Sequence, residues 1–259
     1  MSEIAPLISR AEFSACVLHE DADLLVVNKP PWLVCHPSKQ GPWSSLAGAA
    51  REYLGQDTIH LISRLDRETS GVVVIARNPR MAAILQKAQM AGQCRKSYIA
   101  ILTGELSAST DVDAALGPDP DSPVAVIQKT GQGEGFQSAQ TRFEPLAAAN
   151  GFTLSRVIPV TGRKHQIRAH ARHIGHWLVG DKLYGPDPLL YLEFVEHGLT
   201  EKMAEILLLS RQALHAQSIC FDIPVKPIGP FRAPLARDLK LFVLENMGAR
   251  VTKLLQDLC

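Results

Sequence analysis

The stretch that decides the fold lies at residues 64–76, which read Arg-Leu-Asp-Arg-Glu-Thr-Ser-Gly-Val-Val-Val-Ile-Ala. Its second half, residues 72–76, is β-branched and uninterrupted, as is typical of a strand buried on both faces. Its first half places one carboxylate, Asp66, between two arginines, and Thr69-Ser70-Gly71 suits a tight turn. The stretch therefore predicts a turn with charged side chains that leads directly into a core strand.

Asp66 has two interpretations on these residues alone. A carboxylate beside arginine is held ionised, because the positive charge favours its charged form. An ionised and well-positioned Asp can act as a nucleophile, a base or an electrostatic stabiliser. It can equally be a solvated turn residue paired with Arg64 or Arg67, and spacing by itself favours that simpler interpretation.

Strands and helices follow one another irregularly around this stretch. Further apolar segments predict strands at 24–27, 97–103, 139–147, 152–160 and 213–223. Helical spacing predicts helices from Asn78-Pro79 to Gly92, across residues 163–174, over 189–209 and from Leu235 onward. Asn150-Gly151, between two strands, is the pair that most strongly favours a hairpin, and 104–137 is expected to be loops with one short hairpin. We therefore predict an α+β fold with a mixed, largely antiparallel sheet flanked by helices.

Domain organisation is predicted to be simple. The chain has no internal repeat and no low-complexity linker, so residues 1–259 are expected to form one domain. Its core would span about 24–223, with a helical tail at 235–258 that is weakened at Gly248.

Composition excludes several classes of protein. With 259 residues, 46% of them hydrophobic, the chain can bury a substantial core and is too apolar for disorder. No apolar run approaches the ~20 residues of a membrane helix, and Met1–Ile4 does not begin a secretory signal, so we expect a cytoplasmic protein. The five cysteines are scattered without a short pair, so structural zinc is not expected.

Charge is informative only locally. The formal net charge is +1, but residues 163–173 read Arg-Lys-His-Gln-Ile-Arg-Ala-His-Ala-Arg-His, with seven basic or imidazole side chains and no acid. Such a run can bind nucleic acid, or it can be a merely solvated helix face. Zinc is disfavoured here because His165 and His170 are five residues apart, which does not match the i, i+4 spacing of two ligands on one helix face.

Six ordered segments resemble the pseudouridine synthases related to ribosomal large-subunit pseudouridine synthase A. Residues 64–71 resemble the family's R-L-D-x-x-T-S-G motif. Residues 161–170 resemble its T-G-R-x-H-Q-[IL]-R-x-H motif. The other similar segments are Asn28-Lys29-Pro30 with Val34-Cys35-His36-Pro37, residues 95–100 around Tyr98, 173–185 with Gly180-Asp181 and Tyr184-Gly185, and Leu214-His215-Ala216. One departure is Ser63, where the family usually has His.

The resemblance implies an isomerase that converts uridine to pseudouridine in structured RNA, bound in a central cleft. It implies that Asp66 is the catalytic carboxylate. Tyr98 would pack against the uracil and relay the C5 proton, and Arg168 would pair with the catalytic Asp. Without the motif, Tyr98 would be a core residue with a satisfied hydroxyl, and Arg168 could pair with a structural Glu. His36 and His215 have no role in this interpretation beyond loop packing.

The resemblance also suggests how RNA is held. Arg64 would fill the space that the flipped uridine vacates. Arg163, Lys164 and Arg172 would contact phosphates and position the RNA without reading bases. The chemistry requires no cofactor and no metal. No membrane or obligate protein partner is implied, and we expect a monomer.

Two other classes of function fit the sequence less well. A binding protein without catalysis would be expected to lack Asp66, Tyr98 or Arg168, and all three are present. An Asp-nucleophile hydrolase would need a second carboxylate two residues on and a bound Mg²⁺; Glu68 has that spacing, but its surroundings do not fit. The first core-like strand begins at Leu24, so no S4-type RNA-binding domain is expected before it. The RNA substrate, transfer or ribosomal, stays open.

Overall fold

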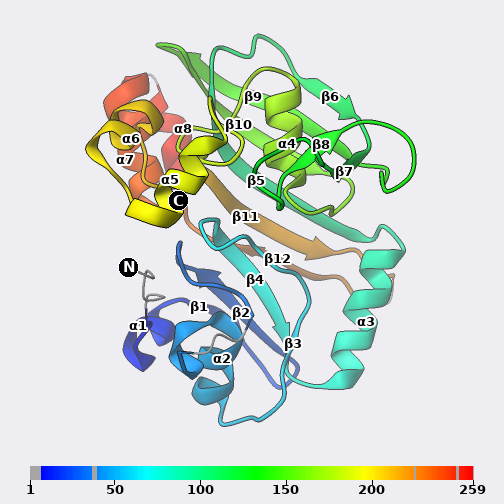
Figure 1. The fold of residues 1–259 in the computed structure, drawn as a ribbon. Coiled ribbons are helices and arrows are strands. Elements are labelled where there is room, and N and C mark those ends of the chain that lie inside the picture. The colour runs from blue at the N-terminus through cyan, green and yellow to red at the C-terminus, as the bar shows by residue number, and fades with distance from the viewer. Residues whose placement is uncertain (1–6, 37–39, 225, 249–250, 259) are drawn as a thin grey trace. The chain divides into compact units, whose positions relative to one another are not determined.

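The computed structural model describes residues 7–36, 40–224, 226–248 and 251–258. By their internal contacts these residues form two compact units (Figure 1). We call residues 7–96 and 215–236 the Asp66 unit, and residues 97–214 and 237–258 the α4 unit. Each unit is described by itself.

The sheet of the Asp66 unit is built around the predicted core strand. Its strand order is β1-β2-β4-β11, with β12 paired to β11 and β3 paired to β4. These strands are β1 Val17–Glu20, β2 Leu24–Lys29, β3 His60–Leu61, β4 Ser70–Ala76, β11 Leu214–Phe221 and β12 Ile228–Arg232. Every residue of β4 is buried, as the β-branched run predicts. β4 runs parallel to β11 and antiparallel to β2 and β3.

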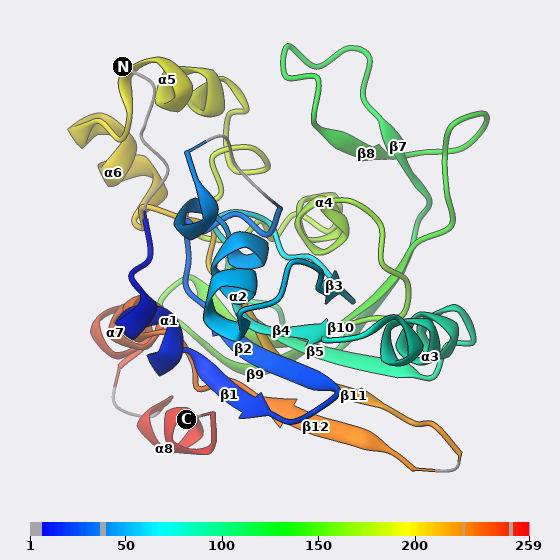
Figure 2. The same ribbon diagram turned by 90° about the horizontal axis from the view of Figure 1, so that it is seen from below.

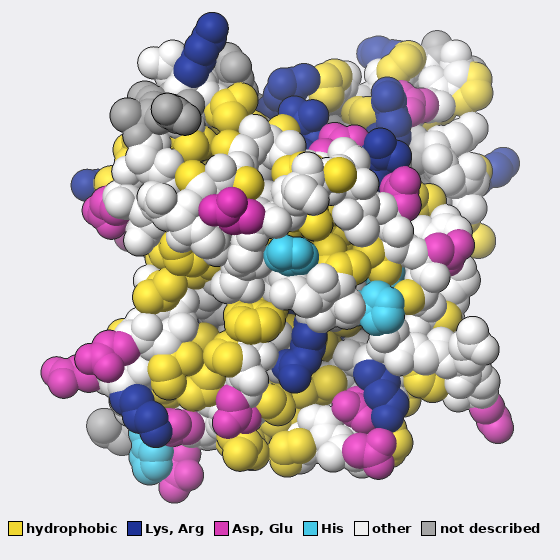
Figure 3. All heavy atoms as spheres, turned by 90° about the horizontal axis from the view of Figure 1, so that it is seen from above, with side chains coloured by type: hydrophobic (Ala, Val, Ile, Leu, Met, Phe, Trp, Pro, Cys, Tyr) yellow, Lys and Arg dark blue, Asp and Glu magenta, His cyan; other side chains and the backbone are white. Residues whose placement is uncertain are grey.

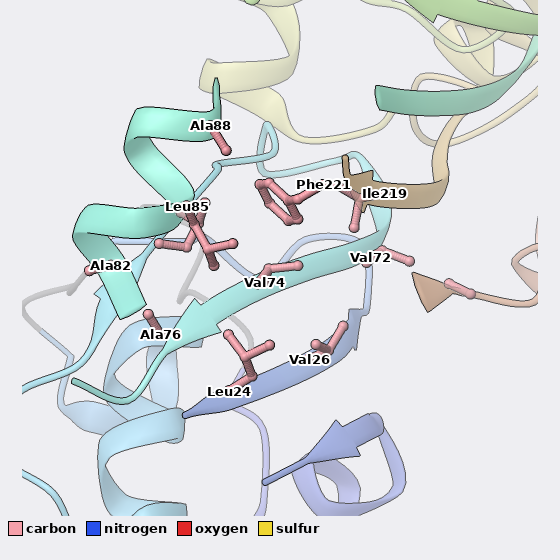
Figure 4. Close-up of a cluster of buried hydrophobic side chains, with 12 residues drawn as sticks. Leu24, Val26, Val72, Val74, Ala76, Ala82, Leu85, Ala88, Ile219 and Phe221 are labelled. Carbon is pink, nitrogen blue, oxygen red and sulfur yellow. The ribbon is translucent and has the colours of Figure 1, made fainter. Parts of the chain in front are cut away.

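The helix that follows β4 covers one face of this sheet (Figure 4). Helix α3, Pro79–Met90, begins where predicted, because the Asn78 side chain accepts from the Met81 N–H at 2.9 Å and Pro79 presets the first turn. Its Ala82, Leu85 and Ala88 pack on alternate residues of β4 and β2 and on the end of β11. This apolar contact holds β4 in place, and the turn that precedes β4 is therefore attached to a rigid strand.

Three further elements of the Asp66 unit were not predicted from the sequence. They are α1 Arg10–Ala15, the 3-10 turn η1 Pro42–Ser44 and α2 Leu46–Leu54. Helix α1 starts with a capping box in which Ser9 and Glu12 bond each other's backbone N–H groups. Strands β1 and β12 were also missed, because short, half-exposed strands have little hydrophobic periodicity.

The sheet of the α4 unit is antiparallel throughout its described pairs. Its strands are β5 Cys94–Thr103, β10 Phe152–Pro159, β9 Gln140–Ala149 and β6 Thr110–Asp113, in that order. Asn150 and Gly151 have φ of 54° and 80°, so the predicted hairpin turn is confirmed with both central residues in the left-handed region. A separate hairpin joins β7 Leu116–Pro118 to β8 Gln128–Thr130. Residues 104–137 thus contain the expected short hairpin and, in addition, the edge strand β6.

Helix α4, Gln166–His173, packs on this sheet (Figure 2). Ile167 and Ala171 of α4 share one buried cluster with Ala100 and Leu102 of β5 and Val157 of β10. The predicted helix at 189–209 is two helices, because Gly198 with φ of 73° ends the first. The remaining helices are α5 Leu189–His197, α6 Glu201–Leu207, α7 Arg237–Met247 and α8 Thr252–Asp257.

The predicted fold class is confirmed. Helices flank the sheet, and β4–β11 is the parallel pair among otherwise antiparallel described pairs. No helix in the described ranges is long and apolar enough to span a bilayer. The single domain and the central RNA-binding cleft stay predictions. Cys259, the last of the five scattered cysteines, lies outside the described residues.

Candidate active site

A hydrogen-bonded turn presents Asp66. The Thr69 N–H donates to the Asp66 carbonyl at 3.1 Å, which closes the turn directly before β4. Asp66 is half-buried and Arg64 is exposed, while Leu65, Thr69 and Ser70 are buried. We call residues 64–71 the Asp66 turn. Its buried residues fix the backbone, and its charged residues reach the surface of the unit.

Lys29, at the end of β2, joins the Asp66 turn to the preceding loop. The side chain is fully buried, and its Nζ donates to the carbonyls of Pro30 at 2.9 Å, Leu33 at 2.9 Å and Arg67 at 3.1 Å. These three carbonyls match the three N–H donors of an ammonium group. Lys29 is thus one of the residues that position the peptide next to Asp66, and sequence reasoning had placed it only within a family-like segment.

A thiol holds the other side of the turn. The backbone N–H of Leu65 lies 3.4 Å from the Cys35 Sγ, which in turn donates to the Leu65 carbonyl at 3.4 Å. Burial raises the pKa of the Cys35 thiol, so it stays protonated and able to donate at neutral pH. The residue before Asp66 is therefore anchored through both of its backbone polar groups.

The end of the turn is locked against β11. Ser70 and Gly71 lie opposite His215 and Ala216 in the parallel pair. Gly71 has a φ of 113°, and a Cβ there would lie 2.2 Å from the Ala216 carbonyl oxygen. Both the backbone angle and the close contact therefore require glycine. The Ser70 hydroxyl lies 2.9 Å from Nδ1 of the fully buried His215, whose Nε2 lies 3.4 Å from the Ala233 carbonyl. His215 thus has a definite structural role.

The two arginines of the turn have different neighbours. Arg64 is exposed and its guanidinium donates to Nε2 of His36. Arg67 donates to the Trp32 carbonyl at 3.3 Å and lies 5.8 Å from the centre of the Trp32 ring. Arg64 is therefore the arginine of the pair that is accessible for a ligand.

In the α4 unit, Arg168 forms a buried ion pair with Asp181. Its Nε and Nη2 donate to the two carboxylate oxygens at 2.7 Å and 2.8 Å, and the side chains are 8% and 0% exposed. Burial opposes the charge on Asp181, but the positive charge and hydrogen bonds of Arg168 and the N–H groups of Tyr184 and Leu183 outweigh it. The pKa of that carboxyl is consequently held below its usual range. The sequence had suggested Asp66 as the acid for Arg168, and that pairing stays a prediction.

Residues 180–185 are shaped to hold this pair. A Cβ at Gly180 would lie 2.0 Å from the Arg211 carbonyl, and one at Gly185 would lie 2.2 Å from the Asp181 carbonyl. The Tyr184 ring lies 5.0 Å from the Arg168 guanidinium, a cation–π contact. The Tyr184 hydroxyl accepts from the Gln128 N–H at 2.8 Å. In the sequence, Asp181 and Tyr184 are visible only as members of a family-like segment, and the tertiary structure shows that they contact Arg168.

Tyr98 lies on β5, opposite Val157 of β10. Its ring is half-buried and packs against the cluster that contains Ile167 and Ala171 of α4. Tyr98 and α4 therefore occupy the same side of the sheet of this unit. The packing matches a core residue, and the partial exposure leaves part of the side chain accessible, so its predicted contact with uracil stays a prediction.

The charge run at 163–173 divides into buried and exposed halves. His170 is fully buried between the Thr141 hydroxyl at 2.9 Å and the Ala114 carbonyl at 2.8 Å, and burial lowers its pKa. The exposed members are Arg163, Lys164, Arg172 and His173. On the face in Figure 3, Lys and Arg side chains are interspersed with acidic ones. The run at 163–173 has no acid, so it is a local basic segment within a chain of near-zero net charge.

Comparisons with known proteins show which family the chain belongs to. Residues 23–173 match the family model of RNA pseudouridylate synthases. An uncharacterized RNA pseudouridine synthase, YjbO of Bacillus subtilis, is 34% identical over 237 residues, 89% of this chain and 76% of the relative. Ribosomal large subunit pseudouridine synthase D of Xylella fastidiosa is 31% identical over 230 residues, 86% of this chain and 66% of the relative.

A solved structure shares the fold. Human RNA pseudouridylate synthase domain containing 4 superposes with a TM-score of 0.71 at 22% identity, over 92% of this chain and 94% of that one. The matched turn and strand of the Asp66 unit and the matched α4 segment define the class as an isomerase that acts on RNA. The chain belongs to the RNA pseudouridylate synthase family, as the motifs predicted.

Proposed function

We propose that the chain isomerises specific uridines of ribosomal or transfer RNA, with Asp66 as the carboxylate that acts on a flipped-out uridine. The observation that carries this proposal is the construction of the Asp66 turn. Lys29, Cys35 and the contact between Ser70 and His215 fix the backbone on both sides of Asp66. A solvated ion pair on a surface would not need such support, whereas a catalytic group does.

The reaction sets the requirements for the side chains. The N1–C1′ bond of uridine breaks, a C5–C1′ bond forms, C5 loses its proton and N1 gains one, so the product is an isomer. Asp66 would promote the cleavage at the ribose or the base. Tyr98, half-buried in the α4 unit, would contact the uracil and relay the C5 proton. A phenol suits both tasks, because it has an apolar face and a polar tip.

Arg168 would keep the catalytic carboxylate ionised. Asp181 accepts from Nε and Nη2 of its guanidinium, and a guanidinium, with five N–H donors, can bond more than one carboxylate at a time. The buried pair with Asp181 supports this assignment because it fixes the orientation of the guanidinium before any substrate binds.

The RNA itself would be held by exposed cations. Arg64 would occupy the space left by the flipped uridine after exchanging its contact with His36. Arg163, Lys164 and Arg172 are exposed, as phosphate contacts require. Relatives named for the ribosomal large subunit make ribosomal RNA the first substrate to test. We further propose a cytoplasmic, monomeric, single-domain enzyme that needs no obligate protein partner, cofactor or metal.

The test is release of tritium from RNA labelled at uracil C5. Recombinant protein would be incubated separately with ribosomal and transfer RNA from cells that lack the protein, alongside Asp66→Ala. We expect release from one pool by the wild type and none above background by the variant. Equal release by both proteins, or none on any pool, would refute the proposal. Mapping pseudouridines that disappear from cells without the protein would then identify the position.

A further inference from the structure

The α4 unit contains a pocket that the proposed reaction does not use. Its volume is about 470 Å³, and its walls come from residues 119–130, from α4 and from residues 183–188. This volume falls within the roughly 300–1,000 Å³ of small-molecule sites. Helix α4 and β8 lie side by side in Figures 1 and 2, and residues of both line the pocket.

The inner part of the pocket is apolar. Ala169 of α4, Ile127 and Leu183 line it, and all three are buried. Tyr184, which lies against Arg168, also contributes to the wall. A flat, weakly polar group such as a nucleobase would bury its faces well against such a lining.

The rim carries hydrogen-bonding groups. Nη1 of Arg172 donates to the Gly185 carbonyl at 2.9 Å, and within the described part of the chain the guanidinium has no other hydrogen-bond acceptor. Nδ1 of His173 lies 3.0 Å from the Thr130 hydroxyl, which leaves the second ring nitrogen to a ligand. Lys129 pairs with Asp119 at 2.8 Å and Asp121 at 3.0 Å, so these charges offset one another. The rim therefore offers donors and acceptors without a strong net charge.

The pocket is next to the predicted catalytic arginine. Arg168 and Arg172 are four residues apart on α4, which places them slightly more than one turn, roughly 6 Å, apart along the helix. An RNA strand whose target uridine lies at Arg168 would bring the next phosphate to Arg172 and the adjoining base to the pocket.

We propose that this pocket binds an unpaired nucleobase next to the target uridine, while Arg172 contacts the phosphate between them. The inference deepens the proposed function and rests on it for the identity of the target. The pocket would thereby select RNA in which the neighbour of the uridine is also unstacked. That selection would come from shape and stacking rather than from base-edge readout.

The first experiment measures binding and needs no catalysis. Pro123 lines the pocket and is exposed, whereas Ala125 is exposed on the same loop but does not line it. The affinity of a fluorescein-labelled, single-stranded 12-mer of uridylate would be compared for the wild type, Pro123→Trp and Ala125→Trp. We expect about tenfold weaker binding for Pro123→Trp, which equals about 1.4 kcal/mol, and less than a twofold change for Ala125→Trp. Equal binding by the three proteins would overturn the proposal.

A second variant tests the pocket in case Pro123→Trp does not fold. His173 is exposed at the end of α4, so His173→Ala is expected to fold, as circular dichroism would verify, and to bind the 12-mer about threefold more weakly. Free uridine monophosphate tests the alternative that the pocket serves a small metabolite. If Pro123→Trp abolished binding of the mononucleotide but bound the 12-mer as the wild type does, the RNA assignment would be wrong.

The third measurement separates this proposal from the proposed function. On RNA that contains the mapped uridine, Pro123→Trp should raise KM about tenfold and leave kcat within twofold. Replacing the neighbouring nucleotide by an abasic one should weaken the wild type but not Pro123→Trp. If the wild type releases no tritium, the proposed function fails, and the 12-mer still decides whether the pocket binds RNA. If kcat falls and KM does not, the base pocket is refuted while the enzyme stands.

Discussion

The Asp66 turn at 64–71 and the α4 segment at 163–173 are both rich in charge, yet they place their charges in opposite ways. In the Asp66 turn the apolar and small residues are buried and the charged ones reach the surface. In the α4 segment an arginine and a histidine are buried and hydrogen-bonded, and the outer arginines and lysine are exposed. The difference shows that a run of charges does not by itself indicate a surface.

The reason lies in the geometry of each element. A turn that leads into a buried strand can direct short side chains inward and long ones outward. A helix packed on a sheet turns 100° per residue and must bury whatever falls on its inner faces. Six consecutive residues of α4, Gln166–Ala171, are buried, so its polar members require dedicated partners. The buried residues of the turn are therefore uncharged, whereas the buried polar residues of α4 are held by specific hydrogen-bond partners.

The largest predicted effect in this comparison is the loss of activity when Asp66 is removed. Asp66→Ala should lower kcat/KM for tritium release by about 10⁴-fold or more, as is usual when a residue that reacts with substrate is removed. Glu68→Ala, in the same turn, is the matched control and should retain activity within about threefold. Comparable losses for the two variants would mean that the turn matters only as a structure.

The next largest effect concerns the buried pair of α4. Asp181→Ala leaves the Arg168 charge buried without its carboxylate and should lower the free energy of unfolding by about 3–5 kcal/mol, measured with urea. The contribution depends on pH, because the pKa of Asp181 is lower in the folded state. It should be complete above about pH 4, the range of an unfolded Asp, and be lost as the pH falls toward the folded-state value. A variant, Asp181→Asn, that showed the same acid loss as the wild type would place the effect elsewhere.

A smaller effect should follow from loosening the Asp66 turn. Ser70→Ala removes the hydroxyl next to the buried His215 and should destabilise the protein by about 1–2 kcal/mol. Because the same bond positions Asp66, kcat should fall several-fold while KM stays constant. Ser218→Ala, in the strand that carries His215, serves as the control. A loss of stability with unchanged kcat would show that Ser70 supports the fold but not the catalytic turn.

The smallest effect is expected at the exposed end of the α4 segment. Lys164→Ala should leave the unfolding free energy within about 0.5 kcal/mol, because the side chain is exposed. It should weaken RNA binding about equally for all sequences and reduce the salt dependence by roughly one phosphate contact. An unchanged slope of log affinity against log salt concentration would remove Lys164 from the RNA-binding surface.

Much of this protein could be predicted from its sequence. The β-branched run at 72–76, the Asn78-Pro79 cap and the Asn150-Gly151 turn act through local backbone preferences, and the structure confirms all three. Ordered motifs around Asp66, Tyr98 and Arg168 identified the family. The break at Gly198 was missed because apolar spacing on both sides of it continues as one helix would.

Other features depend on residues that are far apart in the chain. Arg168 and Asp181, Ser70 and His215, and Lys29 and the Arg67 carbonyl are brought together by packing, and only packing decides which polar group is buried and must be paired. Gly71 is recognisable in the sequence as part of a motif, but only the position of the Ala216 carbonyl explains why no side chain fits there. The sequence alone determined the family, the main strands and the identity of the reactive carboxylate to test. The tertiary structure decided which charged residues are buried and paired and which are exposed, because burial is a property of the fold rather than of a residue.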